Sequence, residues 1–185
     1  MLHLTRMISR LLVLAATVAA APLGAQPPAS RAPAAPPAPA TNPAADRAEV
    51  LGVVKKLFDA MRAGDSSAAR AVFHPQAQLS SALVGRDGTP QVRIDSLPSF
   101  LKSLGTPHAE VWDGRTSGEI VHLDGPLAVV WTRYAFYAGT KFSHCGVDAF
   151  QMARTAAGWR IVSLIDTRQR TGCPEQPQGA GSAAP

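Results

Sequence analysis

The second half of the chain most limits what this protein can fold into, because from His108 onward strand-forming runs alternate with short turns. Gly, Pro, Asp, Thr and Ala residues at 124–126, 139–140 and 156–158 interrupt runs of apolar and β-branched residues. The runs between these turns predict strands at 108–113, 116–123, 127–138, 141–154 and 159–170. Turns this short join antiparallel neighbours, so this half of the chain predicts an antiparallel sheet.

The preceding segment has helical patterns. A first helix is expected from an acidic cap at Asp46 to Gly64, with apolar residues at helical spacing: Val50, Val53, Val54, Leu57, Phe58 and Met61. Further patterns predict a helix at 68–73, a β-hairpin from strands at 77–84 and 89–94, and a third helix at 97–104 capped by Ser96. Helices followed by antiparallel strands predict an α+β fold, in which the helices cover one face of a curved sheet.

Both ends of the chain differ in composition from this domain, expected at 46–175. Residues 1–25 have the layout of a secretory signal peptide, with a basic start, a short apolar run and cleavage expected after Ala25. Residues 26–45 are a Pro/Ala-rich linker and residues 176–185 a small-residue tail, both expected to be disordered. We therefore expect a secreted or periplasmic protein without a membrane span in the mature chain. The alternatives are a retained membrane anchor and a polyproline ligand.

The charge distribution argues against nucleic acid as a partner. Three of the 18 Lys and Arg residues lie before residue 46, whereas all 13 acidic residues lie at or after it. The domain therefore carries 15 basic against 13 acidic residues, which is not the basic patch that a nucleic-acid site requires.

Four stretches of the strand region resemble the nuclear transport factor 2-like superfamily: 129–137, 142–148, 158–161 and 166–173. Within it, the chain looks most like the secreted group labelled "putative lumazine-binding", which is related to SnoaL-like polyketide cyclases and ketosteroid isomerases. The resemblance implies a cone-shaped fold, in which a strongly curved antiparallel or mixed sheet carries three N-terminal helices on its concave face. Members include isomerases, cyclases, dehydratases and proteins without catalysis, so the resemblance assigns no reaction.

Counting residues away from the hairpin turns predicts which side chains share a face of the sheet. A three-residue loop at 156–158 sets Asp148 opposite Asp166, and a tight turn at 139–140 sets Trp131 beside Asp148 and Arg133 beside Gly146. Because side chains alternate along a strand, one face then holds Trp131, Arg133, Tyr137, His144, Asp148, Phe150, Leu164, Asp166 and Arg168, with Val129, Met152 and Val162 deeper along it. We expect a ligand where the polar members meet the open end of the cone.

These residues support two functional hypotheses. In the first, the chain binds a small molecule through Trp131, Arg133, Tyr137, Arg168 and Trp112. In the second, it is a cofactor-independent isomerase, lyase or cyclase, in which Asp148 or Asp166 is the general base and His144 or Tyr137 steadies an oxyanion. Catalysis requires one desolvated acid without a partner, whereas a binding site tolerates a fully paired set of charges. The alternatives are a buried ion-pair lattice without chemistry and an aromatic core.

Neither a cofactor nor a metal is expected, because the other histidines have no ligand spacing with His144 and no phosphate-binding loop is present. A third hypothesis is protein interaction, with a homodimer formed through the opposite, outer face of the sheet. That face is expected to carry Thr132, Tyr134, Phe136, Val147, Ala149, Ile161 and Ile165.

Cys145 and Cys173 are the only cysteines, and in an oxidising compartment such a pair predicts a disulfide. A straight strand would hold them roughly 13 Å apart, so the bond requires a turn at Thr171-Gly172. Two free thiols are the alternative.

Overall fold

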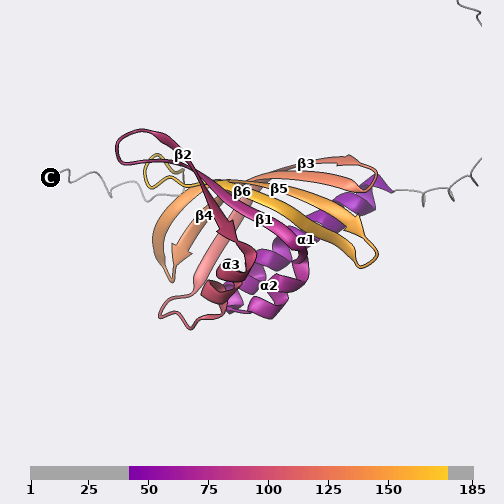
Figure 1. The fold of residues 1–185 in the computed structure, drawn as a ribbon, viewed down its shortest axis with the longest axis horizontal. Helices are drawn as coiled ribbons and strands as arrows, with labels where there is room; N and C mark the ends of the chain where they lie inside the picture. The colour runs from indigo at the N-terminus through magenta and orange to yellow at the C-terminus, as the bar shows by residue number, and fades with distance from the viewer. Residues whose placement is uncertain (1–41, 175–185) are drawn as a thin grey trace, which may run out of the picture. The chain divides into compact units, whose positions relative to one another are not determined.

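The computed structural model describes residues 42–174, which form three helices and a six-stranded sheet (Figure 1). The helices are α1 (Pro43–Ala63), α2 (Ser66–Val72) and α3 (Leu97–Gly105). The strands are β1 (Phe73–Val84), β2 (Pro90–Ser96), β3 (Trp112–Asp124), β4 (Leu127–Ala138), β5 (Lys141–Thr155) and β6 (Gly158–Thr167). The expected signal peptide, nearly all of the expected linker, and the tail lie outside the described residues.

The sheet is mixed, with the strand order β2-β1-β6-β5-β4-β3. Strands β1 and β6 run parallel, and every other neighbouring pair is antiparallel. Figure 1 shows the strongly twisted sheet with the three helices gathered on one side of it. The predicted α+β class is therefore confirmed. The hairpin turns could not predict the parallel pair. They show only how consecutive strands pair, whereas β1 and β6 are the first and last strands in the chain.

Helix α1 begins at Pro43, earlier than the sequence predicts. The side chain of Asn42 accepts hydrogen bonds from the backbone N–H groups of Ala44 and Ala45, both at 3.2 Å, and so satisfies donors that the first turn leaves free. Pro43 fits the start of a helix, where its missing N–H would have no partner. The expected cap, Asp46, instead pairs with Arg154 of β5. Residues 43–45, expected to belong to the linker, are instead the first residues of α1.

One face of α1 forms the centre of the core, as its apolar spacing predicts. Val50, Val54 and Leu57 are at most 2% exposed. They belong to a cluster that includes residues from the sheet: Val130, Phe150, Met152, Trp159 and Ile161. Burying a large apolar side chain contributes about 1.5–3 kcal/mol, so this packing outweighs the individual surface ion pairs.

The two strands predicted at 108–113 and 116–123 are replaced by one strand, β3, which begins only at Trp112, so residues 108–111 lie outside the sheet. Gly114 lies where a break was expected, but its role is packing: a Cβ atom there would lie 2.5 Å from Cδ1 of Phe58 on α1. The irregularity in β3 comes later, between Ser117 and Ile120, where Gly118 has a φ of 67°. The missing side chain of Gly114 lets α1 lie close to the sheet.

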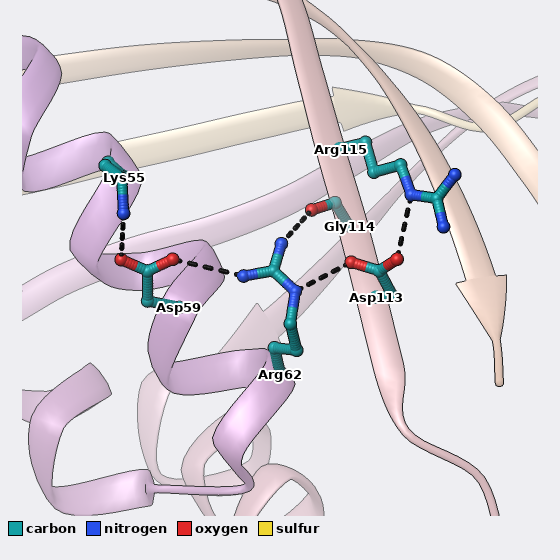
Figure 2. Close-up of polar contacts among 6 residues, drawn as sticks. All are labelled: Lys55, Asp59, Arg62, Asp113, Gly114 and Arg115. Atoms are coloured by element: carbon teal, nitrogen blue, oxygen red, sulfur yellow. Dashed lines mark hydrogen bonds and ion pairs between the residues drawn. The ribbon is translucent and has the colours of Figure 1, made fainter.

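A chain of ion pairs joins α1 to β3 beside this contact (Figure 2). Arg62 donates to Asp59 at 3.1 Å, to Asp113 at 2.8 Å and to the carbonyl of Gly114 at 3.2 Å. Burial disfavours ionised Asp113, yet hydrogen bonds from Arg62 and Arg115 outweigh it, so that the pKa of Asp113 is lowered overall. The cluster fixes the last turn of α1 over β3.

Candidate functional site

The pairing of β4 with β5 differs from the prediction by one residue. It is regular from the turn through Tyr137–Phe142, but Phe136 pairs with His144, so that Ser143 is an extra residue on β5. Thr132 therefore lies opposite Asp148, and Trp131 lies opposite Ala149. A one-residue shift moves every later side chain to the other face of a strand. This irregularity is a β-bulge, and the turn gives no sign of it.

The shift corrects the predicted site on β4. Trp131 and Arg133 lie on the outer face, and Trp131 is 50% exposed. Tyr137 packs under the guanidinium of Arg115, 4.2 Å from the ring centroid, and does not line the cavity described below. Thr132, Tyr134 and Phe136, expected on the outer face, lie on the inner face instead.

The pairing of β5 with β6 places Asp148 opposite Asp166, as predicted, although the hairpin differs. The loop contains two residues rather than three, because Thr155 pairs with Gly158. A second irregularity at Gln151/Met152 leaves Val162 as an extra residue and restores the expected register beyond it. Of the deeper inner-face positions, Met152 was predicted correctly. Val130 and the fully buried Ile161 stand where Val129 and Val162 were expected.

A cavity of about 410 Å³ lies between the sheet and the helices α1 and α3. Of the residues predicted for the site, Trp112, His144, Asp148, Asp166 and Arg168 line it, whereas Trp131, Arg133 and Tyr137 do not. Its apolar wall includes Leu57, Phe58, Met61, Phe100, Trp112, Phe136 and Phe150. Its polar wall includes Ser81, Arg93, Asp95, His144, Asp148, Asp166 and Arg168. The cavity suits a ligand with an apolar body and a polar group at one side.

Asp148 is the distinctive residue of this cavity. It is 6% exposed, and within the described residues its carboxyl makes no hydrogen bond or ion pair. Burial, followed by repulsion from Asp166, raises the pKa of Asp148 to about 8, although Arg168 opposes the shift. The carboxyl is therefore mostly protonated at neutral pH and can both donate and accept a hydrogen bond.

Asp166 has the partners that Asp148 lacks. It accepts from Nε of Arg168 at 2.7 Å and from the hydroxyl of Tyr134 at 3.3 Å. The same hydroxyl donates to the carbonyl of Thr167 at 2.8 Å. Burial, and then the negative charge of Asp166, raises the pKa of Tyr134 far above its usual value, so the phenol remains neutral. Of the two facing carboxyls, Asp166 has the arginine partner, and Asp148 is the one whose raised pKa keeps it protonated at neutral pH.

His144 lies at the rim against aromatic rings. Its ring stacks on Phe136 with centroids 5.0 Å apart, and its Nδ1 is 3.0 Å from Oγ of Ser143. Burial, followed by repulsion from Arg168, lowers the pKa of His144, so the imidazole is neutral at neutral pH. Across residues 42–174, no group of three or more His, Cys, Asp and Glu side chains is arranged to hold a metal ion.

Several residues of the polar wall were missed by the sequence analysis because they come from β1 and β2. Arg93 donates to Asp95 at 3.0 Å and to Oγ of Ser81 at 3.4 Å. Ser81 is 1% exposed and pairs in register with Asp166 across the parallel strands. Only the long-range β1–β6 pairing brings these residues to the site.

Cys145 and Cys173 form a disulfide with their Cα atoms 5.9 Å apart, as the sequence predicted. Gly172 has a φ of 73°, a left-handed conformation that glycine adopts without strain, and it lies in the expected turn. Cys145 pairs with Gln169 across the strands.

A second depression, of about 590 Å³, lies between α1, α2 and the β5–β6 turn. Its wall is largely alanine, and its two acids are engaged: Asp59 pairs with Lys55 and Arg62, and Asp65 caps α2. It therefore offers no free acid comparable with Asp148. No helix within the described range has the length and apolar character needed to cross a membrane.

Comparisons with solved structures support the fold. An NTF2-like protein of unknown function from Shewanella baltica has 16% identity and a TM-score of 0.54, over 70% of this chain and 98% of that one. An NTF2-like protein with a cystatin-like fold from Novosphingobium aromaticivorans has 14% identity and a TM-score of 0.57, over 70% and 86%. A "putative dehydratase" of the NTF2-like family from Streptomyces avermitilis has 18% identity and a TM-score of 0.55, over 69% and 99%.

Sequence comparison defines the family more closely. No curated protein matches the chain. The family model described as "Putative lumazine-binding" matches residues 45–165, which include nearly all of α1, the sheet up to most of β6, and Asp148. The chain therefore belongs to the "Putative lumazine-binding" family, and its fold is like that of the NTF2-like proteins compared above.

Proposed function

We propose that this chain binds a small, largely apolar molecule that carries a hydrogen-bond acceptor such as a carbonyl oxygen. The observation that carries the proposal is Asp148, a buried carboxyl that faces a cavity without a protein partner among the described residues. Its protonated form offers a donor to a carbonyl, and the aromatic wall packs against the rest of the molecule. A volume of about 410 Å³ lies within the range of small-molecule sites.

A matched pair of probes tests this proposal. β-Tetralone and tetralin share a bicyclic body, but only the ketone has an acceptor for Asp148. We expect NMR titration to show that the ketone binds more tightly than tetralin, by about tenfold in dissociation constant for one hydrogen bond. Asp148→Leu should abolish this difference. Asp148→Asn keeps a donor and is the control. Equal binding of both probes would reject the role of Asp148, and binding of neither would reject this ligand class.

A second candidate is a cofactor-independent isomerase, lyase or cyclase. The observation in its favour is the same desolvated carboxyl without a partner, which is the condition for catalysis stated above. Once ionised, Asp148 could take a proton from the carbon next to a carbonyl, while the electron pair moves to the carbonyl oxygen. Arg168 or His144 would stabilise that oxygen. The dehydratase description of one structural neighbour supports this class only at the level of the fold.

Proton exchange distinguishes the two candidates. In heavy water, a general base would accelerate deuterium incorporation beside the carbonyl of β-tetralone, and the rate would rise with pH as Asp148 ionises. Asp148→Asn removes the base while it preserves the shape of the side chain. If the protein binds the ketone but exchange is no faster than in buffer alone, the catalytic candidate is rejected and ligand binding is retained as the proposed function.

We also propose that the chain is exported, with its signal peptide removed after Ala25. The leader-like composition supports this, and so does the Cys145–Cys173 disulfide, because such bonds persist in oxidising compartments. Mass spectrometry of the protein from a periplasmic or culture fraction tests it. A chain that retains its first residues would contradict cleavage.

A homodimer through the outer face remains part of the proposal, with corrected residues. One transverse row crosses all six strands on that face, through Ile94, Ser80, Ile165, Ala149, Trp131 and Ile120. A twofold axis parallel to the strands would set Trp131 of one copy against Ser80 of the other, and Ile165 against Ala149. Large residues would thus meet small ones at the four central positions of a row roughly 24 Å long, and Ile94 would meet Ile120 at its two ends.

Light scattering tests the dimer. Trp131→Glu should yield monomers, whereas Val111→Glu, which changes a similarly exposed apolar residue outside the row, should leave the dimer intact. Phe136→Glu would not test the dimer, because Phe136 lines the cavity. A monomeric unmutated protein would reject the proposal.

A further inference from the structure

Strand β6 leaves the regular ladder where it passes the cavity. Its last regular partner pair is Asp148–Asp166. At the next position, the N–H of Val147 donates to the side-chain hydroxyl of Thr167 at 3.0 Å. The carbonyl of Thr167 accepts from the hydroxyl of Tyr134 on β4. The backbone carbonyl of Thr167 thus bonds to the side chain of Tyr134, which lines the cavity, instead of to the backbone of β5.

Gly146 makes room for this arrangement. A Cβ atom at Gly146 would lie 2.8 Å from the carbonyl carbon of Thr167, nearer still to its oxygen, and 3.0 Å from the ring of Tyr134. Every residue other than glycine would therefore push Thr167 or Tyr134 away. The displaced groups would be those that contact Asp166.

After Thr167, the chain is attached to β5 again. Backbone hydrogen bonds of 2.9 and 2.8 Å join Cys145 and Gln169, and the disulfide ties Cys145 to Cys173. Both cysteines are 7% exposed. Arg168 lies between the two attachments, with its Nε 2.7 Å from Asp166. The segment 167–173 is thus held by Tyr134 at one end and by the disulfide at the other.

We propose that the Cys145–Cys173 disulfide is a positioning element of the cavity, which holds residues 167–169 against β5 so that Arg168 stays on Asp166 and water stays away from Asp148. The polar wall of the cavity then assembles fully only in the oxidised chain. The disulfide acts through Arg168 and Tyr134 and does not itself contact a ligand. The inference goes beyond the proposed function, because it concerns how the site is formed.

The titration of Asp148 reports on this arrangement without any ligand. Burial and the charges of Asp166 and Arg168 act on it, and the other titratable or charged groups that line the cavity are Arg93, Asp95, Tyr134 and His144. NMR of the carboxyl carbon in the full mature chain follows its ionisation, and Asp148→Asn identifies the signal. We expect Cys145→Ser/Cys173→Ser, and the reduced and alkylated protein, to titrate at least about one pH unit lower than the oxidised protein, because water entry removes the desolvation.

Two further variants separate positioning from general stability. Gly146→Ala keeps the disulfide but displaces Thr167, so it should lower the midpoint in the same direction. Asp46→Asn loosens α1 from Arg154 at a distant point, and should lower the melting temperature without moving the midpoint. An unchanged midpoint in folded Cys145→Ser/Cys173→Ser would overturn the proposal. If that variant does not fold, an unchanged midpoint in Gly146→Ala would overturn it. Because ligand binding is not measured, neither result affects the proposed function.

Discussion

Asp148→Asn should stabilise the protein at alkaline pH and have little effect at acidic pH. The carboxyl of Asp148 has its pKa raised from the ordinary 3.8 to about 8 in the folded chain. The folded state therefore holds a proton that the unfolded state loses at lower pH. Stability from this group is fully present below about pH 4, falls as the pH rises towards 8, and is constant beyond it.

The size of the effect follows from the width of that window. Each pKa unit is about 1.4 kcal/mol, so a shift from 3.8 to about 8 corresponds to roughly 5–6 kcal/mol lost between the two pH limits. Asparagine has the same shape and does not titrate. The difference in unfolding free energy between Asp148→Asn and the unmutated protein should therefore grow with pH, by several kcal/mol.

Urea unfolding followed by circular dichroism, at intervals from about pH 4 to about pH 9, measures this difference directly. Comparing the two proteins at each pH cancels the contributions of groups that titrate alike in both. Parallel stability profiles would refute the reasoning, since they would mean that Asp148 is either hydrated or paired in the folded protein. A variant that is less stable at every pH would point to an essential hydrogen bond.

The remaining predictions concern packing, charge and the domain boundary. Gly114→Ala should cost about 1–3 kcal/mol in thermal or urea unfolding by overpacking against Phe58, and Phe58→Leu should recover part of that loss in the double variant. Asp166→Asn should destabilise the protein and lower the pKa of Asp148 in an NMR titration, because it removes both the partner of Arg168 and the repulsive charge; an unchanged titration would contradict the coupling. A fragment of residues 42–174 should fold by proton NMR, and Asn42→Ala should cost it about 1 kcal/mol through loss of the helix cap, whereas an unaffected fragment would show that Asn42 does not cap in solution.

The sequence predicted the bounds of the helices and strands better than it predicted which face of the sheet each side chain occupies. Strand β4 has the predicted bounds, and Asp148 lies opposite Asp166, because turn residues and alternation are local signals. The face of β4 was wrong because the extra residue at Ser143 follows from how β5 packs, and nothing in its composition marks a bulge. The loop at 156–158 was predicted one residue too long, and the extra residue Val162 in β6 shifts the register back by one. The Asp148–Asp166 pairing was therefore correct only because these two differences cancel.

The contribution of β1 and β2 to the site could not be read from the sequence. Ser81 and Arg93 reach the cavity only through the parallel pairing of β1 with β6, which joins distant segments and has no local signal. That Asp148 has no partner among residues 42–174 was likewise unpredictable, because charge patterns show which residues can pair but not which of two acids receives the arginine. The sequence could state two alternatives for these acids, a fully paired set of charges and one desolvated acid without a partner. The geometry of the described residues favours the second.

The parallel contact between β1 and β6 also determines how this sheet can form in time. Pairs such as Phe73–Ile161 and Ala82–Thr167 join segments roughly 85 residues apart, and contacts this distant slow folding. Until β6 has been synthesised, the β1–β2 hairpin and the β3–β4–β5 meander can form only as two separate sheets with open edges. A ribosome-bound chain thus exposes two unfinished edges, which are sites of misassociation, until the last strand joins them.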